Sequence, residues 1–341
     1  MTLRPTGRRR QRGVALIIAL ILVALAAILA TKLSFDSWLE RQRTIGVLAA
    51  EQALHFSLGA EALAADVLTQ TPGGTSAQIT LAQPWAQPTQ PLPLTPDNNP
   101  EGEPIGTLQG ALEDMQGRFN LNNLAHTSAP AQAGAAAGAV APLPDPIPLQ
   151  QFQRLLVSVG LEPKWAGIAR DWIDADDVPG SPDGAEDAVY TAQTPPYRTG
   201  NWPMTTPTEL MNMPGFGADK YRLIAPYVTA LPVANGQMTP INICTAPAKV
   251  LESLADGLNG EYSGSPELLV NGRKAGCFPE PQAFNNVLGK SVGKTAPIGT
   301  NSQYFRLTTR VTLGTTQFTL YSLLYVGTGK VTPLLRTFGT L

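Results

Sequence analysis

An unbroken apolar run near the N-terminus constrains this 341-residue chain more than any other feature. Every residue from Val14 to Ala30 is apolar, and five arginines but no acidic residue precede it within the first 13 positions. These 17 residues are at the short end of what a helix needs to cross a bilayer. Arginines on the upstream side are expected to hold the N-terminus in the cytoplasm, so the remainder of the chain is exported.

The apolar run continues past Lys32 without a glycine or proline break. From Leu33 to Val67 most apolar residues recur at three- and four-residue spacing, which is typical of an amphipathic helix. We therefore predict one helix of about 50 residues, of which residues 14–35 span the membrane. The alternative is an ordinary secretory signal cleaved near the alanine-rich stretch 24–30, but such a signal ends at its cleavage site instead of continuing as a helix.

The chain outside the N-terminal segment is acidic. Without the five N-terminal arginines, the 24 basic residues fall to 19 against 26 acidic residues, a net charge of −7. Binding to a phosphate backbone needs clustered basic residues, so no nucleic-acid partner is expected.

The chain has two cysteines, Cys244 and Cys277, which are too few for a four-thiolate metal site. In an oxidising compartment they could form a disulfide that closes a loop of 33 residues. The alternative is two free thiols buried as small hydrophobic side chains.

Composition and periodicity divide the rest of the chain into segments. Prolines are dense between residues 72 and 104, which predicts an extended loop with a short strand at 78–82. Residues 105–120 are predicted to form two short strands, and the Ala-, Gly- and Pro-rich stretch 125–148 a linker. Helices are expected at residues 149–159, 165–173, 207–213, 219–227, 246–258 and 281–288. Period-two runs at 304–312 and 317–326, joined at Gly314, predict a β-hairpin.

Acidic residues cluster between positions 171 and 187, in a segment that also contains Gly180, Pro182 and Gly184. Alternating carboxylates on a glycine-bearing loop supply the hard oxygen ligands that calcium prefers, so we expect one or two calcium ions here. The spacing is not that of an EF-hand, and the alternative is a solvated acidic loop with helix-capping aspartates. The candidate ligands are Asp174, Asp176, Asp177, Asp183, Glu186 and Asp187.

No catalytic motif is evident in the sequence, so we predict that the protein is not an enzyme. His55 falls within the long helix and His126 at the linker edge, and neither has a partner in a nucleophile motif. A paired-carboxylate hydrolase site in the acidic cluster is the remaining enzymatic hypothesis. The turn 209–217 resembles a helix-hairpin-helix, but only Lys220 and Arg222 are basic nearby, which favours a tight interhelical turn over DNA binding.

The N-terminal segment resembles that of type IV pilins and pseudopilins. In those proteins prepilin peptidase cleaves on the cytoplasmic side after a glycine that precedes the apolar run, and the matching residue here is Gly13. The resemblance implies that Val14 is the first residue of the mature chain and is methylated. Most such proteins carry glutamate at the fifth mature position, where this chain has Ile18. Because an unpaired acid in lipid is costly, its absence suggests a subunit with no neighbour above it, as at a filament tip.

Blocks spread over nearly the whole chain resemble the type II secretion system protein K family of minor pseudopilins. They include Gly13 and residues 51–54, 59–62, 114–124, 171–176, 184–187, 195–198, 209–210, 226–232 and 241–247. The resemblance implies an α+β fold in which a long N-terminal helix packs on an antiparallel sheet, with an inserted all-helical domain and bound calcium. Two features depart from the family: Cys244 replaces the usual asparagine, which fits a lineage-specific disulfide, and residues 127–148 look like an insertion.

The resemblance also implies a domain order. We expect a prepilin leader at residues 1–13, a transmembrane helix at 14–35, a pilin-like αβ domain at 36–124 and 233–341, and the inserted helical domain at 125–232. The expected protein is a single-pass subunit of the inner membrane with a periplasmic ectodomain. It would cap the pseudopilus tip and support export of folded proteins across the outer membrane.

The partners implied by the resemblance are prepilin peptidase, the minor pseudopilins protein I, protein J and protein H, the secretin and the exoprotein cargo. The alternatives are a membrane-tethered or secreted hydrolase that uses the 171–187 cluster, and a competence-type DNA-binding protein.

Overall fold

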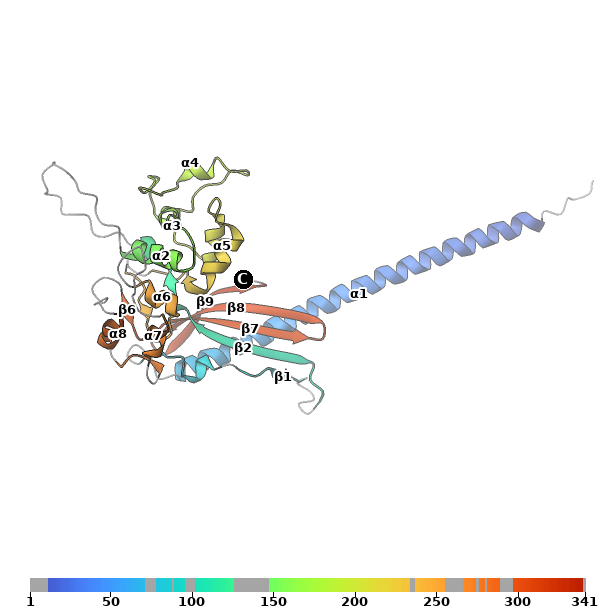
Figure 1. The fold of residues 1–341 in the computed structure, drawn as a ribbon. Helices are drawn as coiled ribbons and strands as arrows, with labels where there is room; N and C mark the ends of the chain where they lie inside the picture. Colours follow the sequence, from blue (N-terminus) through green and yellow to red (C-terminus); the bar gives the residue numbers. More distant parts are fainter. Residues whose placement is uncertain are drawn as a thin grey trace, which may run out of the picture.

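The computed structural model describes residues 12–70, 78–87, 89–95, 102–125, 147–233, 237–254, 266–273, 276–279, 281–288 and 297–339. Most of the predicted leader and of the Ala/Gly/Pro-rich linker lies outside these residues. The described chain forms a long helix packed on a sheet, with a layer of short helices at one end of the sheet (Figure 1).

The N-terminal apolar run is part of a single helix, α1 (Arg12–Gln70), as the periodicity predicts. It extends far beyond the rest of the protein (Figure 1), and the side chains from Val14 to Trp38 are exposed. Apolar side chains such as Ile18, with 52% of their surface exposed, need lipid or other apolar contacts to replace water. By length and composition, α1 can cross a membrane.

The C-terminal half of α1 packs on the sheet because its buried residues recur along one stripe, including Ala53, Ser57, Ala64 and Leu68. Glu61 adds polar contacts between α1 and the sheet beside this apolar stripe. Its carboxylate accepts hydrogen bonds from the Ser322 hydroxyl at 2.7 Å and from Nη2 of Arg336 at 2.7 Å.

The main sheet has five strands in the order β1-β2-β7-β8-β9, and all neighbours are antiparallel. The predicted hairpin is present as β7 and β8, with Gly314 at a φ of +56° in the turn. The strand bounds are β1 (Leu92–Leu94), β2 (Gly106–Asp114), β7 (Tyr304–Leu313), β8 (Thr316–Gly327) and β9 (Lys330–Phe338). Residues 78–82, where a short strand was expected, form none.

Residues 105–120 differ from the prediction of two similar short strands. β2 runs through Gly110 as one nine-residue strand, since β7 pairs with it along its whole length. The chain then turns through the 3-10 helix η2 (Met115–Gly117) into the two-residue strand β3 (Phe119–Asn120). A further 3-10 helix, η1 (Pro84–Ala86), lies in the proline-rich segment.

A large insert separates β2 from β7, which are neighbours in the sheet although residues 115–303 lie between them in the chain. It contains the helices α2 (Ile147–Ser158), α3 (Trp165–Ile173), α4 (Asp187–Tyr190), α5 (Gly217–Ile224), α6 (Ala248–Glu252), α7 (Pro266–Asn271) and α8 (Pro281–Leu288). The 3-10 helices η3 (Leu121–Ala125), η4 (Pro207–Asn212) and η5 (Ala225–Tyr227) complete the helical part.

The insert is not purely helical, because two short parallel strand pairs close it. β3 pairs with β4 (Val228–Thr229), and β5 (Ile241–Asn242) pairs with β6 (Ile298–Gly299). The core of the insert includes Phe119 and Phe152, whose rings stack at 5.2 Å, and also Val250 and Phe284. By packing, the insert therefore extends past residue 232, where the sequence-based division ends it, to about residue 298.

Asp114, at the end of β2, joins the sheet to the insert. Its buried carboxylate accepts hydrogen bonds from the hydroxyls of Ser302 and Thr245, each at 2.6 Å. Nδ2 of Asn242 and the backbone N–H of Gln116 also donate to it, at 2.9 and 2.8 Å. Burial raises the pKa of this carboxyl, while the four hydrogen bonds oppose that shift.

A disulfide joins Cys244 to Cys277 in the structure, with their Cα atoms 4.6 Å apart. Both side chains are buried in the core of the insert. The bond connects the segment after β5 to the segment that precedes α8.

Candidate metal centre

The acidic loop is shaped by Asp171, which the sequence analysis does not propose as a ligand. This residue lies in α3 and is fully buried, and Nη2 of Arg170 pairs with it at 3.2 Å. Oδ2 of Asp171 accepts the backbone N–H groups of Gly180 and Ala185 at 2.8 and 3.0 Å. Asp171 thereby folds the following loop back onto the end of α3.

Gly184 permits this tight return of the chain. A Cβ atom at this position would lie 2.1 Å from the backbone nitrogen of Gly180, so no larger residue fits without a shift of the backbone. The N–H of Gly184 donates to the carbonyl of Gly180 at 2.6 Å. Because of this close approach, the next acidic residue, Glu186, lies near the end of α3.

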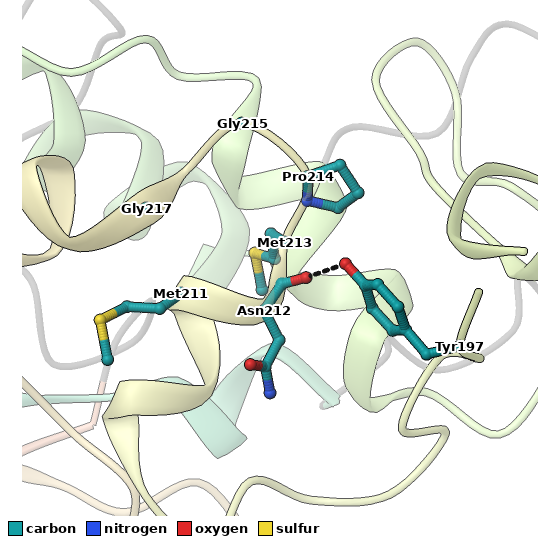
Figure 2. Close-up of a pocket in the computed structure, with 7 residues that line it drawn as sticks. All are labelled: Tyr197, Met211, Asn212, Met213, Pro214, Gly215 and Gly217. Carbon is teal, nitrogen blue, oxygen red and sulfur yellow. Dashed lines mark hydrogen bonds between the residues drawn. The ribbon is translucent and has the colours of Figure 1, made fainter. Parts of the chain in front are cut away.

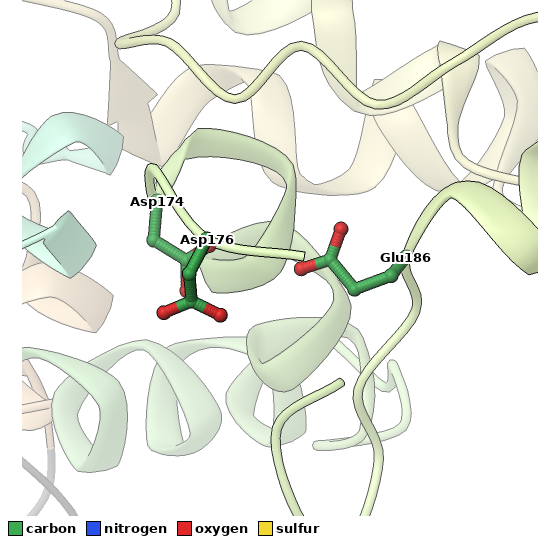
Figure 3. Close-up of side chains that lie close together, drawn as sticks. All are labelled: Asp174, Asp176 and Glu186. Carbon is green, nitrogen blue, oxygen red and sulfur yellow. The ribbon is translucent and has the colours of Figure 1, made fainter. Parts of the chain in front are cut away.

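Three carboxylates meet where the loop returns. Asp174, Asp176 and Glu186 each have an oxygen within 4.8 Å of the others, and Figure 3 shows Glu186 approaching the two aspartates from a separate stretch of chain. Oδ1 of Asp174 and both oxygens of Glu186 are buried and have no hydrogen-bond partner. Buried carboxylate oxygens without a partner are rare, because they lose hydration and gain nothing in return.

The electrostatics of this cluster are unfavourable for the ionised carboxylates. Burial raises the pKa of Glu186 to about 7, with further contributions from Asp171, Asp174, Asp176 and Asp177. Burial also raises the pKa of Asp174 to about 6, again with neighbouring aspartates adding to the shift. A bound cation would offset both the burial of the carboxylates and their mutual repulsion, since it supplies an opposite charge and occupies the unpaired oxygens.

The other three predicted ligands are not part of this group. Asp177 accepts a hydrogen bond from Nδ2 of Asn201 at 3.1 Å, and Asp183 is exposed in the loop. Asp187 begins α4 and accepts the backbone N–H and hydroxyl of Thr199 at 3.1 and 3.0 Å. It also pairs with Arg198 at 3.4 Å. Of the six predicted carboxylates, the structure brings three together.

The donor set fits a hard divalent cation. Carboxylate oxygens suit calcium, and neither histidine nor cysteine belongs to the group of three acids. Oδ1 of Asn201 is another buried oxygen without a partner, while its Nδ2 contacts the loop at Asp176 and Asp177. The amide oxygen of Asn201 is thus a nearby neutral oxygen that sequence spacing alone does not reveal.

Affinity for calcium should decrease as the pH is lowered from about 8 to about 5. Both carboxyls must lose a proton to bind the ion, so protonation of Glu186 competes below about pH 7 and that of Asp174 below about pH 6. We expect a loss of about tenfold per pH unit at first and a steeper loss below about pH 6.

The stability of the metal-free protein should change with pH in the opposite direction to the calcium affinity. Because folding raises both pKa values, the metal-free native state binds more protons than the unfolded state and gains stability as the pH falls through this range. Calorimetric titration at several pH values checks the prediction, and an affinity that does not change with pH would contradict it.

The predicted helix-hairpin-helix turn forms a tight connection between η4 and α5. Gly215 and Gly217 have φ angles of +82° and +67°, which glycine adopts without strain. Lys220 donates to the carbonyl of Gly215 at 2.7 Å, and Figure 2 shows the surface hollow beside the turn, where the Tyr197 hydroxyl donates to the carbonyl of Asn212. These contacts favour a structural interhelical turn.

The two histidines offer no catalytic pair among the residues that the structure describes. His55 is exposed on α1, and His126 lies outside the described residues.

Comparison with known proteins gives the same family as the sequence blocks. The family model described as type II secretion system (T2SS), protein K, matches residues 117–233. The type II secretion system protein K of Pseudomonas aeruginosa is 31% identical, over 97% of this chain and 94% of that protein. The protein of the same name from Pectobacterium carotovorum subsp. carotovorum is 30% identical, over 97% and 98%. The chain belongs to the type II secretion system protein K family.

A solved structure extends the likeness to the fold. The protein is similar to a chain in the crystal structure of the GspK–GspI–GspJ complex from the type 2 secretion system of enterotoxigenic Escherichia coli, with a TM-score of 0.70 and 25% identity. The match covers 88% of this chain and all of that one. The α+β fold, with its long helix, antiparallel sheet and helical segments, is therefore confirmed as that of the protein K family, a component of secretion machinery and not a known class of enzyme.

Proposed function

We propose that this protein is the protein K subunit of a type II secretion system and acts as a minor pseudopilin at the tip of the periplasmic pseudopilus. The match to the crystal structure, which covers all of the matched chain, carries the proposal. In this role the protein supports export of folded proteins across the outer membrane and does no chemistry of its own.

The exposed N-terminal part of α1 serves as the membrane anchor. Residues 14–35 span the inner membrane, with the arginine-rich N-terminus in the cytoplasm and the sheet and insert in the periplasm. Prepilin peptidase removes residues 1–13 before assembly, and the new N-terminus at Val14 is methylated.

The insert and the N-terminal sequence both favour a terminal position. The insert adds a bulky head to the end of a pilin-like sheet, and a subunit stacked on that end would clash with it. Ile18 occupies the position at which shaft subunits carry the glutamate that pairs with a neighbour. The tip would include protein I and protein J, by similarity to the solved complex, together with protein H, beneath the secretin and close to exoprotein cargo.

Calcium has a structural role in this proposal. Asp174, Asp176 and Glu186 would hold an ion that fixes the loop after α3 in the head of the subunit. Asp177 and Asp183 lie on the same loop and Asp187 begins α4. These three would serve a second ion only after Asp177 and Asp187 give up their contacts with Asn201 and with Thr199 and Arg198.

Replacing Gly13 with leucine should abolish processing and secretion. A bulky residue before the cleavage site keeps the leader on the chain, so Val14 never becomes the N-terminus. Intact mass and N-terminal sequencing of membrane-derived protein, together with an assay of secreted exoproteins, measure both effects. Gly7→Leu, a matched change within the leader, should leave both normal. Normal processing of Gly13→Leu, or a mature chain that starts near Thr31, would contradict the assignment.

A further inference from the structure

The main sheet has one face covered by α1 and one that α1 does not cover. Side chains alternate along a strand, and the buried residues Phe305, Leu307 and Leu324 face α1. Tyr304, Arg306 and Arg310 therefore project from the opposite face, as do the residues that pair with them on β8. Figure 1 shows α1 lying along one side of the strands.

This opposite face, which we call the outer sheet face, consists of Tyr304, Arg306, Arg310, Tyr321, Leu323 and Tyr325 with the threonines between them. The rings of Tyr304 and Tyr325 lie 5.2 Å apart across the β7–β8 pair. All six side chains are partly or fully exposed. Tyrosine and arginine are the residues most enriched in the centres of protein–protein interfaces.

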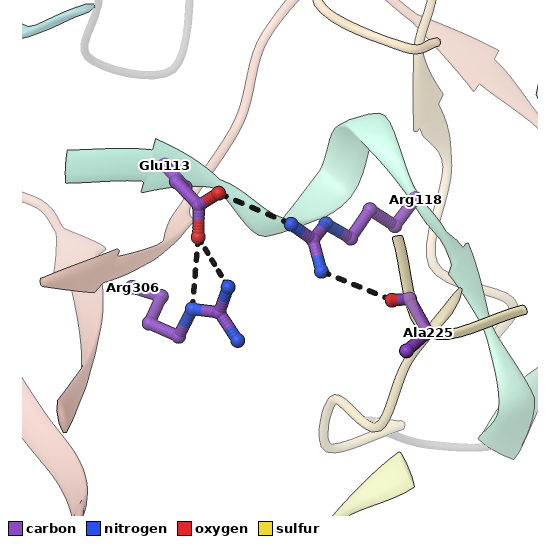
Figure 4. A network of polar contacts seen from close by, with 4 residues as sticks. All are labelled: Glu113, Arg118, Ala225 and Arg306. Carbon is purple, nitrogen blue, oxygen red and sulfur yellow. Dashed lines mark hydrogen bonds and ion pairs between the residues drawn. The ribbon is translucent and has the colours of Figure 1, made fainter. Parts of the chain in front are cut away.

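A fixed pair of arginines lies at one end of the outer sheet face. Oε1 of Glu113 accepts from Nη2 of Arg118 at 3.2 Å, and Oε2 accepts from Nε of Arg306 at 2.9 Å (Figure 4). Nη1 of Arg118 donates to the carbonyl of Ala225 at 3.3 Å. One carboxylate thus orients two guanidinium groups. The two arginine side chains therefore lose less conformational entropy when a partner binds.

The charges on this face do not balance. Among the described residues of this face, Arg118, Arg306 and Arg310 stand against Glu113, which pairs with the first two. The adjacent Asp114 points to the other face, where its Oδ2 accepts from the hydroxyls of Ser302 and Thr245. Burial lowers the pKa of Arg118, and the Glu113 carboxylate opposes that shift. The rest of the exported chain is net acidic, so the outer sheet face is a basic area on an acidic protein.

We propose that the outer sheet face docks an acidic segment of another protein. Its carboxylates would meet the Arg118–Arg306 pair and Arg310. Its apolar groups would cover Leu323 and Tyr321, which lie opposite the stretch from Arg306 to Thr308. Arg306 and Arg310 are four residues apart on one strand, so the two carboxylates should be roughly 13 Å apart. An apolar centre between charged groups is typical of protein partners, whereas phosphate polymers need denser basic clusters.

Site-specific photo-crosslinking in cells with an intact secretion system tests this proposal on the full-length chain. Thr308 lies between Arg306 and Arg310 on the same face, so a photoreactive residue placed there should form an adduct with a discrete protein. Mass spectrometry should locate the crosslink in a peptide rich in Asp and Glu. Arg310→Glu should reduce the adduct about fivefold or more, and Arg310→Lys should retain most of it.

Arg222→Glu is the matched control, because Arg222 is an exposed arginine on α5 that pairs with Asp219 and is not part of the outer sheet face. Reversal of its charge should change the yield by less than about twofold. Arg310 is exposed, so its variants should fold normally, and an unchanged melting temperature verifies this. The proposal is overturned by a missing adduct, an adduct to lipid or nucleic acid alone, a crosslinked peptide without acidic residues, or a yield that Arg310→Glu leaves unchanged. Processing at Gly13 can be monitored in the same cells, so a failure of the pseudopilin assignment is recognised separately.

Discussion

Chelation of calcium should lower the melting temperature of the purified full-length protein in detergent by about 5–15 °C. An ion present at 100 to 1,000 times its dissociation constant contributes about 3–4 kcal/mol to folding, and in a protein of this size each kcal/mol shifts the melting temperature by about 2–4 °C. The physical reason is that the buried, unpaired carboxylates of Asp174 and Glu186 repel each other once the ion is removed.

The stability of the double variant Asp174→Asn, Glu186→Gln relative to the wild type should reverse between calcium and chelator. With calcium present it should be less stable than the wild type, because ligands are lost. With chelator present it should be more stable, because the repulsion between buried carboxylates is gone. Asp183→Asn, a neutralisation at an exposed position in the same loop, should behave like the wild type. Identical scans of the wild type with and without chelator would rule out a structural ion at this site.

Asp114→Ala should lower the free energy of unfolding by about 3–5 kcal/mol. The change removes the carboxylate that accepts from the hydroxyls of Ser302 and Thr245 in the interior, at the junction between the sheet and the insert. The amide of Asn242 loses one of its acceptors and keeps the carbonyl of Ile79. Urea unfolding measures the loss. Asp219→Ala removes an exposed carboxylate paired with Arg222 and should cost less than about 1 kcal/mol. Equal effects of the two changes would mean that the junction does not depend on Asp114.

The elements with a strong local pattern could be predicted from the sequence. The apolar run and the three- and four-residue spacing predict α1, and strict alternation around Gly314 predicts β7 and β8. β9 has no such pattern, because Pro333 interrupts it and the pairing with β8 shifts register at Leu334. As an edge strand, β9 tolerates the proline, since its free side needs no N–H donor. β1 was missed for the same reason, with Pro93 in its centre.

The acidic segment could be found from the sequence, but the ligands could not be separated from their neighbours. Asp174, Asp176 and Glu186 converge because Asp171 and Gly184 fold the loop, which depends on three-dimensional contacts and not on spacing. Asp177 and Asp187 look equivalent in the sequence, yet their oxygens are bound by Asn201 and Thr199. The acidic cluster and the resemblance to protein K both predict calcium, and the unpaired oxygens of Asp174 and Glu186 support that prediction on independent grounds.

The contacts that unite the fold lie far apart in the chain. Asp114 and Ser302 are 188 residues apart, and Glu61 and Arg336 are 275 residues apart. No local pattern marks such pairs, so a single sequence gives no physical reason to connect them. The resemblance to a known family predicts the inserted domain, while the polar junction that holds it to the sheet becomes evident only in the structure.

The most direct test of the tip assignment is the native mass of the complex that the full-length protein forms with protein I and protein J after mild extraction from membranes. The account predicts a defined complex that contains a single copy of each subunit, with this chain processed at Val14. Recovery of the chain alone, or in polymers that contain many copies of it, would contradict a role at the tip of the pseudopilus.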